Sequence, residues 1–198
     1  MGNIFTKIKW IAALGLVFII VFMTNQVDKK SFESIKASIE TIYQDRLLVK
    51  GYIYDISSLL EQKKIAVYTN DTIFFEAENE HINEAIEARL GKFYKTKLVN
   101  DENRLLNNFD EDFQKLKTQE MDFDFSESQS AEMLAQLQLL SDDLYDLSRI
   151  QLEEGKKQLQ IAQKSVNVAD LFSQIEIIIL VLIAVIVQFI ILYNPKGK

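Results

Sequence analysis

The stretch SFESIKASIETIYQDRLLVKGYIYDISSLLEQKKIAV, residues 31–67, decides the fold of this chain. Mostly apolar side chains recur in it in unbroken steps of three and four residues: Phe32, Ile35, Ile39, Ile42, Arg46, Val49, Ile53, Ile56, Leu60, Lys63 and Val67. Such steps are typical of a helix that packs one face against other helices in a bundle. The pattern passes Gly51 in phase, so it predicts one helix over residues 28–68.

Three further helices are predicted downstream, over about residues 72–98, 101–120 and from about 128 onward. Their inward faces follow the same spacing: Phe75, Ile82, Ile86, Leu90 and Phe93; Leu105, Leu106, Phe109, Phe113 and Leu116; Met133, Leu137, Leu140, Leu144 and Leu147, then Leu159, Ala162, Val166 and Ala169. Polar turns separate them, with caps expected at Asp71 or Thr72, at Asn100–Asp101, and at Ser126 or Ser128. Short loops favour an all-α fold, an antiparallel four-helix bundle.

Two apolar stretches flank this bundle. Every residue from Trp10 to Met23 is apolar or Gly, and a second run covers residues 177–187 and resumes over 189–193. Each, with its flanks, reaches the roughly 20 residues that a transmembrane helix needs. The expected organisation is a tail over 1–9, a transmembrane helix over 10–26, a bundle over 27–174, a second transmembrane helix over 175–193 and a tail over 194–198. A cleaved signal peptide is the alternative for the first run, but residues 24–27 lack a small-x-small cleavage pattern.

The distribution of charge predicts the topology. The two short tails carry only basic charge, at Lys7, Lys9, Lys196 and Lys198, while the segment between the apolar runs holds the other 18 basic residues and all 29 acidic residues. Short basic tails remain on the cytoplasmic side of a membrane. We therefore expect a protein of the bacterial inner membrane with both termini in the cytoplasm and the bundle in the periplasm.

The composition of the 198 residues excludes several kinds of site. There is no Cys, so thiolate metal sites and Cys nucleophiles are excluded, and the single His81 excludes a His-rich metal centre. The net charge of −7 disfavours nucleic acid as a partner. The acidic residues at 110–112, 122 and 124 lack the alternation and the Gly of a calcium loop. We expect no catalysis, no cofactor and no metal.

One segment resembles a known family. Ile39-Glu40-Thr41-Ile42-Tyr43-Gln44-Asp45-Arg46-Leu47-Leu48 is similar to the first-helix stretch of the four-helix-bundle sensor domain of bacterial methyl-accepting chemotaxis proteins, and Asp101-Glu102-Asn103-Arg104-Leu105-Leu106 is similar to the acidic start of its third helix. The family often continues the first stretch with Pro and Leu, where Val49, Lys50 and Gly51 stand here. The resemblance implies a periplasmic sensing or docking module. It implies no methylation or kinase control, because only residues 194–198 follow the second run.

Two arginines are candidate ligand-binding residues. Arg46 occupies a seam position, where an unpaired guanidinium would be desolvated at high cost. It either binds a small anionic ligand, inside one bundle or between bundles, or pairs with a carboxylate of a neighbouring helix, or extends to the surface. Arg89 and Lys63 carry the same alternatives.

Three residues are candidate partner contacts. Phe123 and Phe125 alternate with acidic residues in the predicted turn, and together with Tyr68, Phe74 and Phe75 they either cap the bundle tip or form a docking patch. Gln188 lies within the second apolar run, where a polar side chain tends to bond another helix.

These observations predict an inner-membrane protein that senses or docks outside the cytoplasm and acts through a partner membrane protein, with a homo-oligomer expected. The alternative is a structural or accessory subunit of a larger inner-membrane complex, such as an ion-driven motor or a transporter, whose bundles form a periplasmic collar.

Overall fold

The computed structural model describes the backbone of residues 2–192 and the side chains of Ile8 and residues 11–189. All its regular elements are helical: α1 (Gly2–Thr41), the π-helix η1 (Ile42–Leu47), α2 (Leu48–Thr69), α3 (Thr72–Ala77), α4 (Asn79–Phe93), α5 (Asn100–Met121) and α6 (Glu127–Leu192). The chain divides into a bundle unit, residues 40–158, and a helix-pair unit, made of residues up to 39 and from 159 onward.

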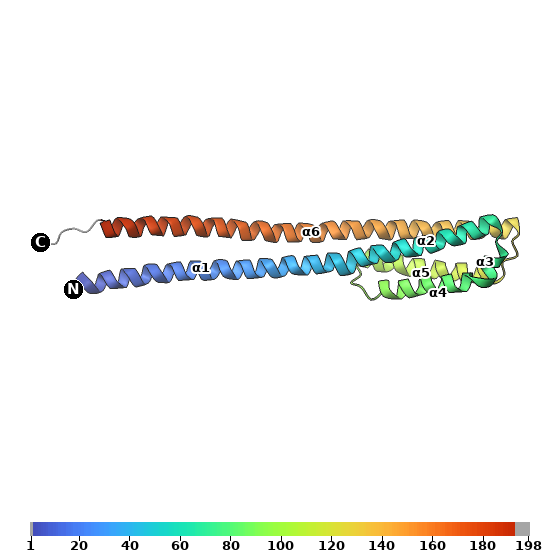
Figure 1. Ribbon diagram of the computed structural model, residues 1–198, viewed down its shortest axis with the longest axis horizontal. Coiled ribbons are helices and arrows are strands. Elements are labelled where there is room, and N and C mark those ends of the chain that lie inside the picture. The colour runs from blue at the N-terminus through green and yellow to red at the C-terminus, as the bar shows by residue number, and fades with distance from the viewer. Residues whose placement is uncertain (1, 193–198) are drawn as a thin grey trace. The chain divides into compact units, whose positions relative to one another are not determined.

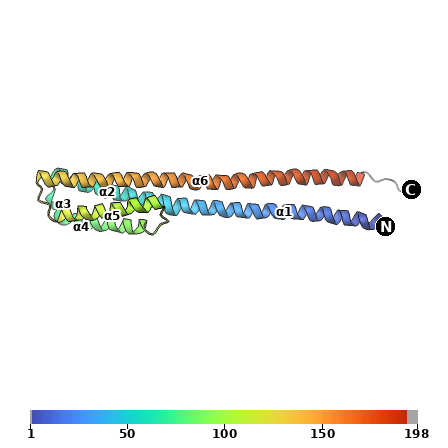
Figure 2. The same ribbon diagram turned by 180° about the vertical axis from the view of Figure 1, so that it is seen from behind.

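The bundle unit packs α2, α4, α5 and α6 around one apolar core, with consecutive helices running in opposite directions (Figures 1 and 2). The predicted inward residues of α3, α4, α5 and α6 within this unit are confirmed as buried, with two exceptions. Leu105 is only half-buried, and Phe74 rather than Phe75 is buried at the tip. An all-α core of long packed helices is therefore correctly predicted.

The turns follow local capping chemistry. Asp71 caps α3 as predicted, because its carboxylate accepts a hydrogen bond from the Phe74 amide at 3.0 Å, and Ser126 accepts one from the Gln129 amide at 3.4 Å. The single helix predicted over 72–98 is wrong, because the chain breaks at Glu78 between α3 and α4, and α4 ends at Phe93. The predicted cap at residues 100–101 is also wrong, since the N-cap of α5 is Val99.

The helical path from Gly2 to Thr69 changes its winding at η1. From this point the predicted seam is confirmed, since these residues are all buried: Arg46, Val49, Ile53, Ile56, Leu60, Lys63 and Val67. Before this point the predicted seam is wrong: Phe32 and Ile39 are 69% and 60% exposed, and the neighbouring Ser31 and Ser38 are buried instead. The wider turn of a π-helix takes up one extra residue, so the buried face shifts by one position across it.

In the helix-pair unit, α1 lies beside α6 through small side chains. Thr24, Ser31, Ser38 and Ala162 are buried, and the Ser165 hydroxyl donates to the Ser34 hydroxyl at 3.0 Å. The predicted inward positions Leu159 and Val166 are exposed, because the small residues form the contact in their place.

Each long helix, α1 and α6, contains an 18-residue stretch apolar enough to cross a membrane. Only 6% of that stretch in α1 and none of it in α6 is buried within the protein. A core helix of a soluble protein would be mostly buried, so these surfaces favour membrane anchoring. The basic tails that predict the topology, Lys7, Lys9, Lys196 and Lys198, lie outside the described side chains, as does the predicted end of the second transmembrane helix at residue 193.

Candidate functional site

A buried polar layer crosses the bundle core near the loops that follow α2 and α5. The Lys63 ammonium donates to the Glu120 carboxylate at 2.7 Å and also to the Asn79 side-chain oxygen. The side-chain amides of Asn79 and Asn83 each donate to the second Glu120 oxygen at 2.9 Å. The side chains of Lys63 and Glu120 are 1% and 3% exposed, so the pair is held almost out of water.

Burial lowers the pKa of Lys63 below its usual value, because a desolvated ammonium is costly, although Glu120 and Glu80 oppose this shift. The carbonyl oxygen of the Asn83 side chain is buried without a hydrogen-bond partner among the described residues. The layer is therefore nearly, but not fully, satisfied. A partly satisfied buried network is a costly element of a core.

A second buried polar layer lies at the opposite end of the apolar core and is organised by Arg46 of η1. The guanidinium donates to the Glu102 carboxylate at 3.0 Å, to the Gln151 side-chain oxygen at 3.1 Å and to the Lys97 backbone oxygen at 3.3 Å. The Glu102 carboxylate also accepts a hydrogen bond from the Gln151 side-chain amide and one from the Val99 backbone amide, the latter at 3.1 Å. Arg46 thus joins η1, the loop before α5, α5 itself and α6.

The pairing of Arg46 with Glu102 is the internal salt bridge that the sequence left open as one of three arrangements. A small anion at Arg46 would have to compete with this carboxylate, and the prediction of a ligand there stays a prediction. Arg89 lies on the surface of α4, 33% exposed, with its Nε 3.1 Å from Asp55. The two arginines do not share one site.

The partners of these cations were missed from the sequence, yet a signal for some of them exists. The buried face of α5 repeats in steps of four and three, and the same steps place a carboxylate at each end of the helix: Glu102, Leu106, Phe109, Phe113, Leu116 and Glu120. Continuing the α6 steps past Leu147 likewise reaches Gln151. A polar residue at a seam position is the pattern to look for.

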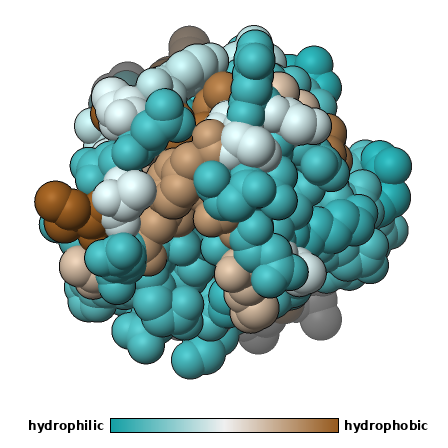
Figure 3. Space-filling model, turned by 90° about the vertical axis from the view of Figure 1, so that its right-hand side faces the viewer, coloured by the Kyte–Doolittle hydropathy of each residue, from teal (hydrophilic) through white to brown (hydrophobic). Residues whose placement is uncertain are grey.

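The tip of the bundle unit gathers aromatic rings from α3 and from the loop before α6. The rings of Phe123 and Phe125 lie 4.4 Å apart between centroids, and each contacts Phe75, at 5.0 and 5.6 Å. Both rings are half-buried, and Tyr68 is 73% exposed and outside the cluster. Figure 3 looks onto this end and shows apolar surface between hydrophilic side chains. The rings close the end of the core, and part of their surface stays exposed to solvent.

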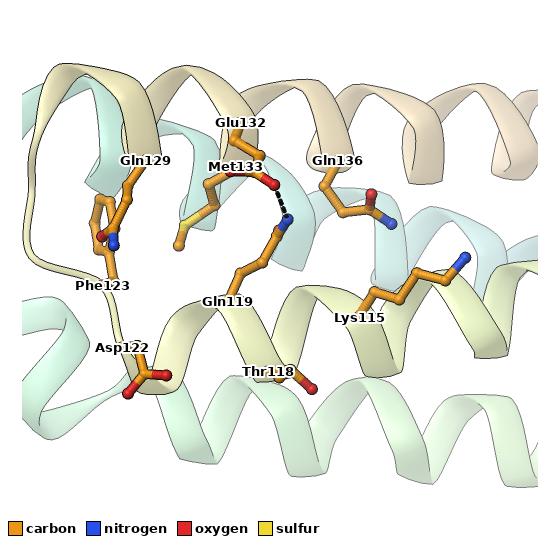
Figure 4. Close-up of a pocket in the computed structure, with 9 residues that line it drawn as sticks. All are labelled: Lys115, Thr118, Gln119, Asp122, Phe123, Gln129, Glu132, Met133 and Gln136. Carbon is orange, nitrogen blue, oxygen red and sulfur yellow. Dashed lines mark hydrogen bonds between the residues drawn. The ribbon is translucent and has the colours of Figure 1, made fainter.

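A cavity of about 540 Å³ opens between α5 and α6 next to this cluster (Figure 4). Seven of its nine lining residues have polar side chains, although apolar atoms contribute much of its surface: Lys115, Thr118, Gln119, Asp122, Phe123, Gln129, Glu132, Met133 and Gln136. The Gln119 amide reaches across to Glu132 at 3.4 Å, while its own carbonyl oxygen is buried without a partner among the described residues. The volume is in the range of small-molecule sites, about 300–1,000 Å³.

Gln188 lies in the apolar stretch of α6 and is exposed within the described part of the chain. The described part of the helix-pair unit therefore does not cover this residue. Pairing with a helix of another protein remains open to it.

Comparison with known proteins gives one match. Residues 3–166 match the family model described as a four-helix-bundle sensory module for signal transduction. No curated protein and no solved structure matches the chain. The match includes both buried polar layers, the tip and the cavity.

Proposed function

Because the chain belongs to the family of four-helix-bundle sensory modules for signal transduction, we propose that it is an inner-membrane sensor that acts through a partner membrane protein. Membership confirms the resemblance to chemotaxis-protein sensor domains that the stretch around Tyr43 and Arg46 indicates. The bundle would lie in the periplasm, and both termini in the cytoplasm.

The observation that carries the membrane part of the proposal is the lack of cover over the two apolar stretches, of which 6% and 0% is buried. Within water, such surfaces would cost about 25 cal/mol per Å² of apolar area. A lipid environment removes this cost, and each helix can enter it because its backbone hydrogen bonds are made within the helix.

The cavity between α5 and α6 is the candidate site for a sensed molecule. Side-chain amides, carboxylates and a half-buried ring there line a space open to solvent. A small polar molecule with both donors and acceptors fits this lining. A screen of such molecules by thermal shift, repeated with Gln119→Leu, tests this part of the proposal.

An oligomer is supported by the exposed face of α2 and α6. Tyr54 and Tyr145 are 75% and 72% exposed and line a groove of about 350 Å³, which Ser57 and Ser141 also line. Aromatic side chains so placed are frequent anchors of protein interfaces. A second copy of the chain covering this face would bury them.

The topology is tested with a reporter that is active only in the cytoplasm. Fused after the C-terminal residue it should be active, and inserted near residue 127 it should be inactive. The reverse pattern would refute the proposed orientation.

The partner is tested by purifying the chain from membranes in mild detergent and identifying bound proteins by mass spectrometry. Gln188→Leu is expected to weaken the association while the bundle stays folded, because it removes the one polar group that the apolar stretch of α6 offers to another helix. Unchanged co-purification would show that this stretch is only an anchor. Stoichiometric recovery in one large complex, without a ligand response, would favour the accessory subunit over the sensor.

A further inference from the structure

Two overlapping seven-residue patterns run along α1, and the structure uses only one of them. The buried pattern consists of small polar residues, Thr24, Ser31 and Ser38. The second pattern, one position later, holds Phe32 and Ile39, which are 69% and 60% exposed. The exposed pattern is the more apolar of the two, which is the opposite of what a packed helix usually shows.

The exposed pattern, not the buried one, is in phase with α2. Seven-residue steps from Phe32 and Ile39 lead to buried positions of the bundle unit: Arg46, Ile53, Leu60 and Val67. Ser38 and Arg46, by contrast, are eight positions apart. One extra residue thus separates the two buried faces, and η1 lies between them. A π-helical segment takes up one extra residue in this way.

The bundle side of η1 is firmly held. Arg46 makes its three contacts to Glu102, Gln151 and Lys97, and the Asp45 carboxylate accepts a hydrogen bond from the Lys97 amide at 3.1 Å. A change of winding within η1 is therefore passed to the residues before Ile42. In the helix-pair unit the contact of α1 with α6 includes one hydrogen bond between side chains, Ser165 to Ser34.

We propose that η1 is a two-register junction. In the register of the structure η1 is π-helical and Ser31 and Ser38 face α6. In the second register residues 42–47 are α-helical, and Phe32 and Ile39 take the places of Ser31 and Ser38. Since one residue of an α-helix corresponds to 100° of rotation and 1.5 Å of rise, the switch turns and moves α1 by these amounts against its neighbour.

The two registers are close in free energy because each is stabilised by a different interaction. The π-helical register keeps small side chains at the α1–α6 contact, which lets the two backbones approach closely. The α-helical register removes Phe32 and Ile39 from water and restores regular hydrogen bonding in η1. This junction goes beyond the proposed function, since it requires neither a particular ligand nor a particular partner.

The test is disulfide trapping in the full chain, in membranes, since the chain has no native Cys. The Oγ atoms of Ser34 and Ser165 are 3.0 Å apart, so Ser34→Cys with Ser165→Cys reports the register of the structure. A shift of one residue brings Ile35 to the place of Ser34, so Ile35→Cys with Ser165→Cys reports the second register. Glu33→Cys with Ser165→Cys is the matched control, because position 33 is exposed in the structure and takes an exposed place in the other register.

Deletion of the exposed Tyr43 removes the extra residue, so that Ser31 and Ser38 face α6 even when the segment is α-helical. We expect it to lower the cross-linking rate of the Ile35 pair at least tenfold relative to the Ser34 pair. Phe32→Ser with Ile39→Ser, which changes only exposed side chains, should also lower the cross-linking rate of the Ile35 pair relative to the Ser34 pair. This variant tests the two-register junction if the deletion variant does not fold. An Ile35 pair that is no faster than the Glu33 control, or whose rate neither change lowers, would overturn the two-register junction.

Discussion

Lys63→Met is expected to destabilise the bundle unit strongly, although it replaces a charged core residue by an apolar one of similar length. The change leaves the Glu120 carboxylate, 3% exposed, without its cation, and the Asn79 side-chain oxygen without its donor. Removing one member of a buried ion pair costs about 3–5 kcal/mol. Since about 1 kcal/mol shifts the melting temperature of a domain of this size by roughly 3–5 °C, we expect a fall of about 10–20 °C.

Adding Glu120→Leu should not restore the stability. The side-chain amides of Asn79 and Asn83 donate only to Glu120 in this layer, so the double variant strands two buried donors. Each unsatisfied buried group costs about 1–3 kcal/mol. Only the variant that also carries Asn79→Leu and Asn83→Leu removes the whole polar layer, and it should recover most of the lost stability, as apolar replacements of complete buried networks do.

The assay is thermal unfolding of the full chain in detergent, followed by circular dichroism at several pH values. Burial lowers the pKa of Lys63 in the folded state, so the unfolded state binds more protons between this pKa and the unfolded value of about 10.5. The contribution of Lys63 to stability therefore rises with pH through this window, and Lys63→Met should lack that rise. A fall of less than about 3 °C for Lys63→Met, with an unchanged pH dependence, would refute the reasoning that the layer is desolvated.

Two further predictions use the same assay. Arg46→Leu should lower the free energy of unfolding by about 3–5 kcal/mol, because it leaves the fully buried Glu102 carboxylate unpaired. Its control, Arg89→Leu, breaks a partly exposed ion pair and should cost at most about 1 kcal/mol. Equal effects of the two changes would contradict the prediction. Phe123→Ser with Phe125→Ser should lower the melting temperature by several degrees because both half-buried rings close the tip, whereas an unchanged melting temperature together with weaker partner binding would show a docking patch instead.

The sequence predicts the bundle core well because apolar residues recur at seam positions in steps of three and four along α2, α4, α5 and α6, and in α4 and α5 few stand elsewhere. In α4, for example, Ile82, Ile86 and Leu90 stand among charged or small residues, so only one face can be buried. The same reasoning fails for α1, where two faces compete. Phe32 and Ile39 continue the apolar repeat, and nothing in the repeat shows that the adjacent Ser31 and Ser38 form the contact in the structure.

The buried polar layers were only half predictable. Arg46 and Lys63 occupy seam positions of the first helix, so the sequence alone identifies them as candidate buried cations. Their carboxylate partners also occupy seam positions, but they lie at the two ends of α5, and Glu side chains are seldom buried, so the sequence favours solvent exposure for both. The partners Asn79 and Asn83 depend on the break at Glu78, which the helix pattern does not predict.

The arrangement of these layers suits a module that must hold one part rigid and let another part shift. Each layer joins a cation of the first helical path to a carboxylate of α5, so a slide of α2 against α5 would strand both carboxylates at once. In the helix-pair unit the contact of α1 with α6 is made through small residues and the hydroxyls of Ser34 and Ser165. A shift of one residue breaks this neutral hydrogen bond, which costs far less free energy than stranding two buried carboxylates. A signal carried by the first helix would therefore appear before Ile42 and leave the bundle core unchanged.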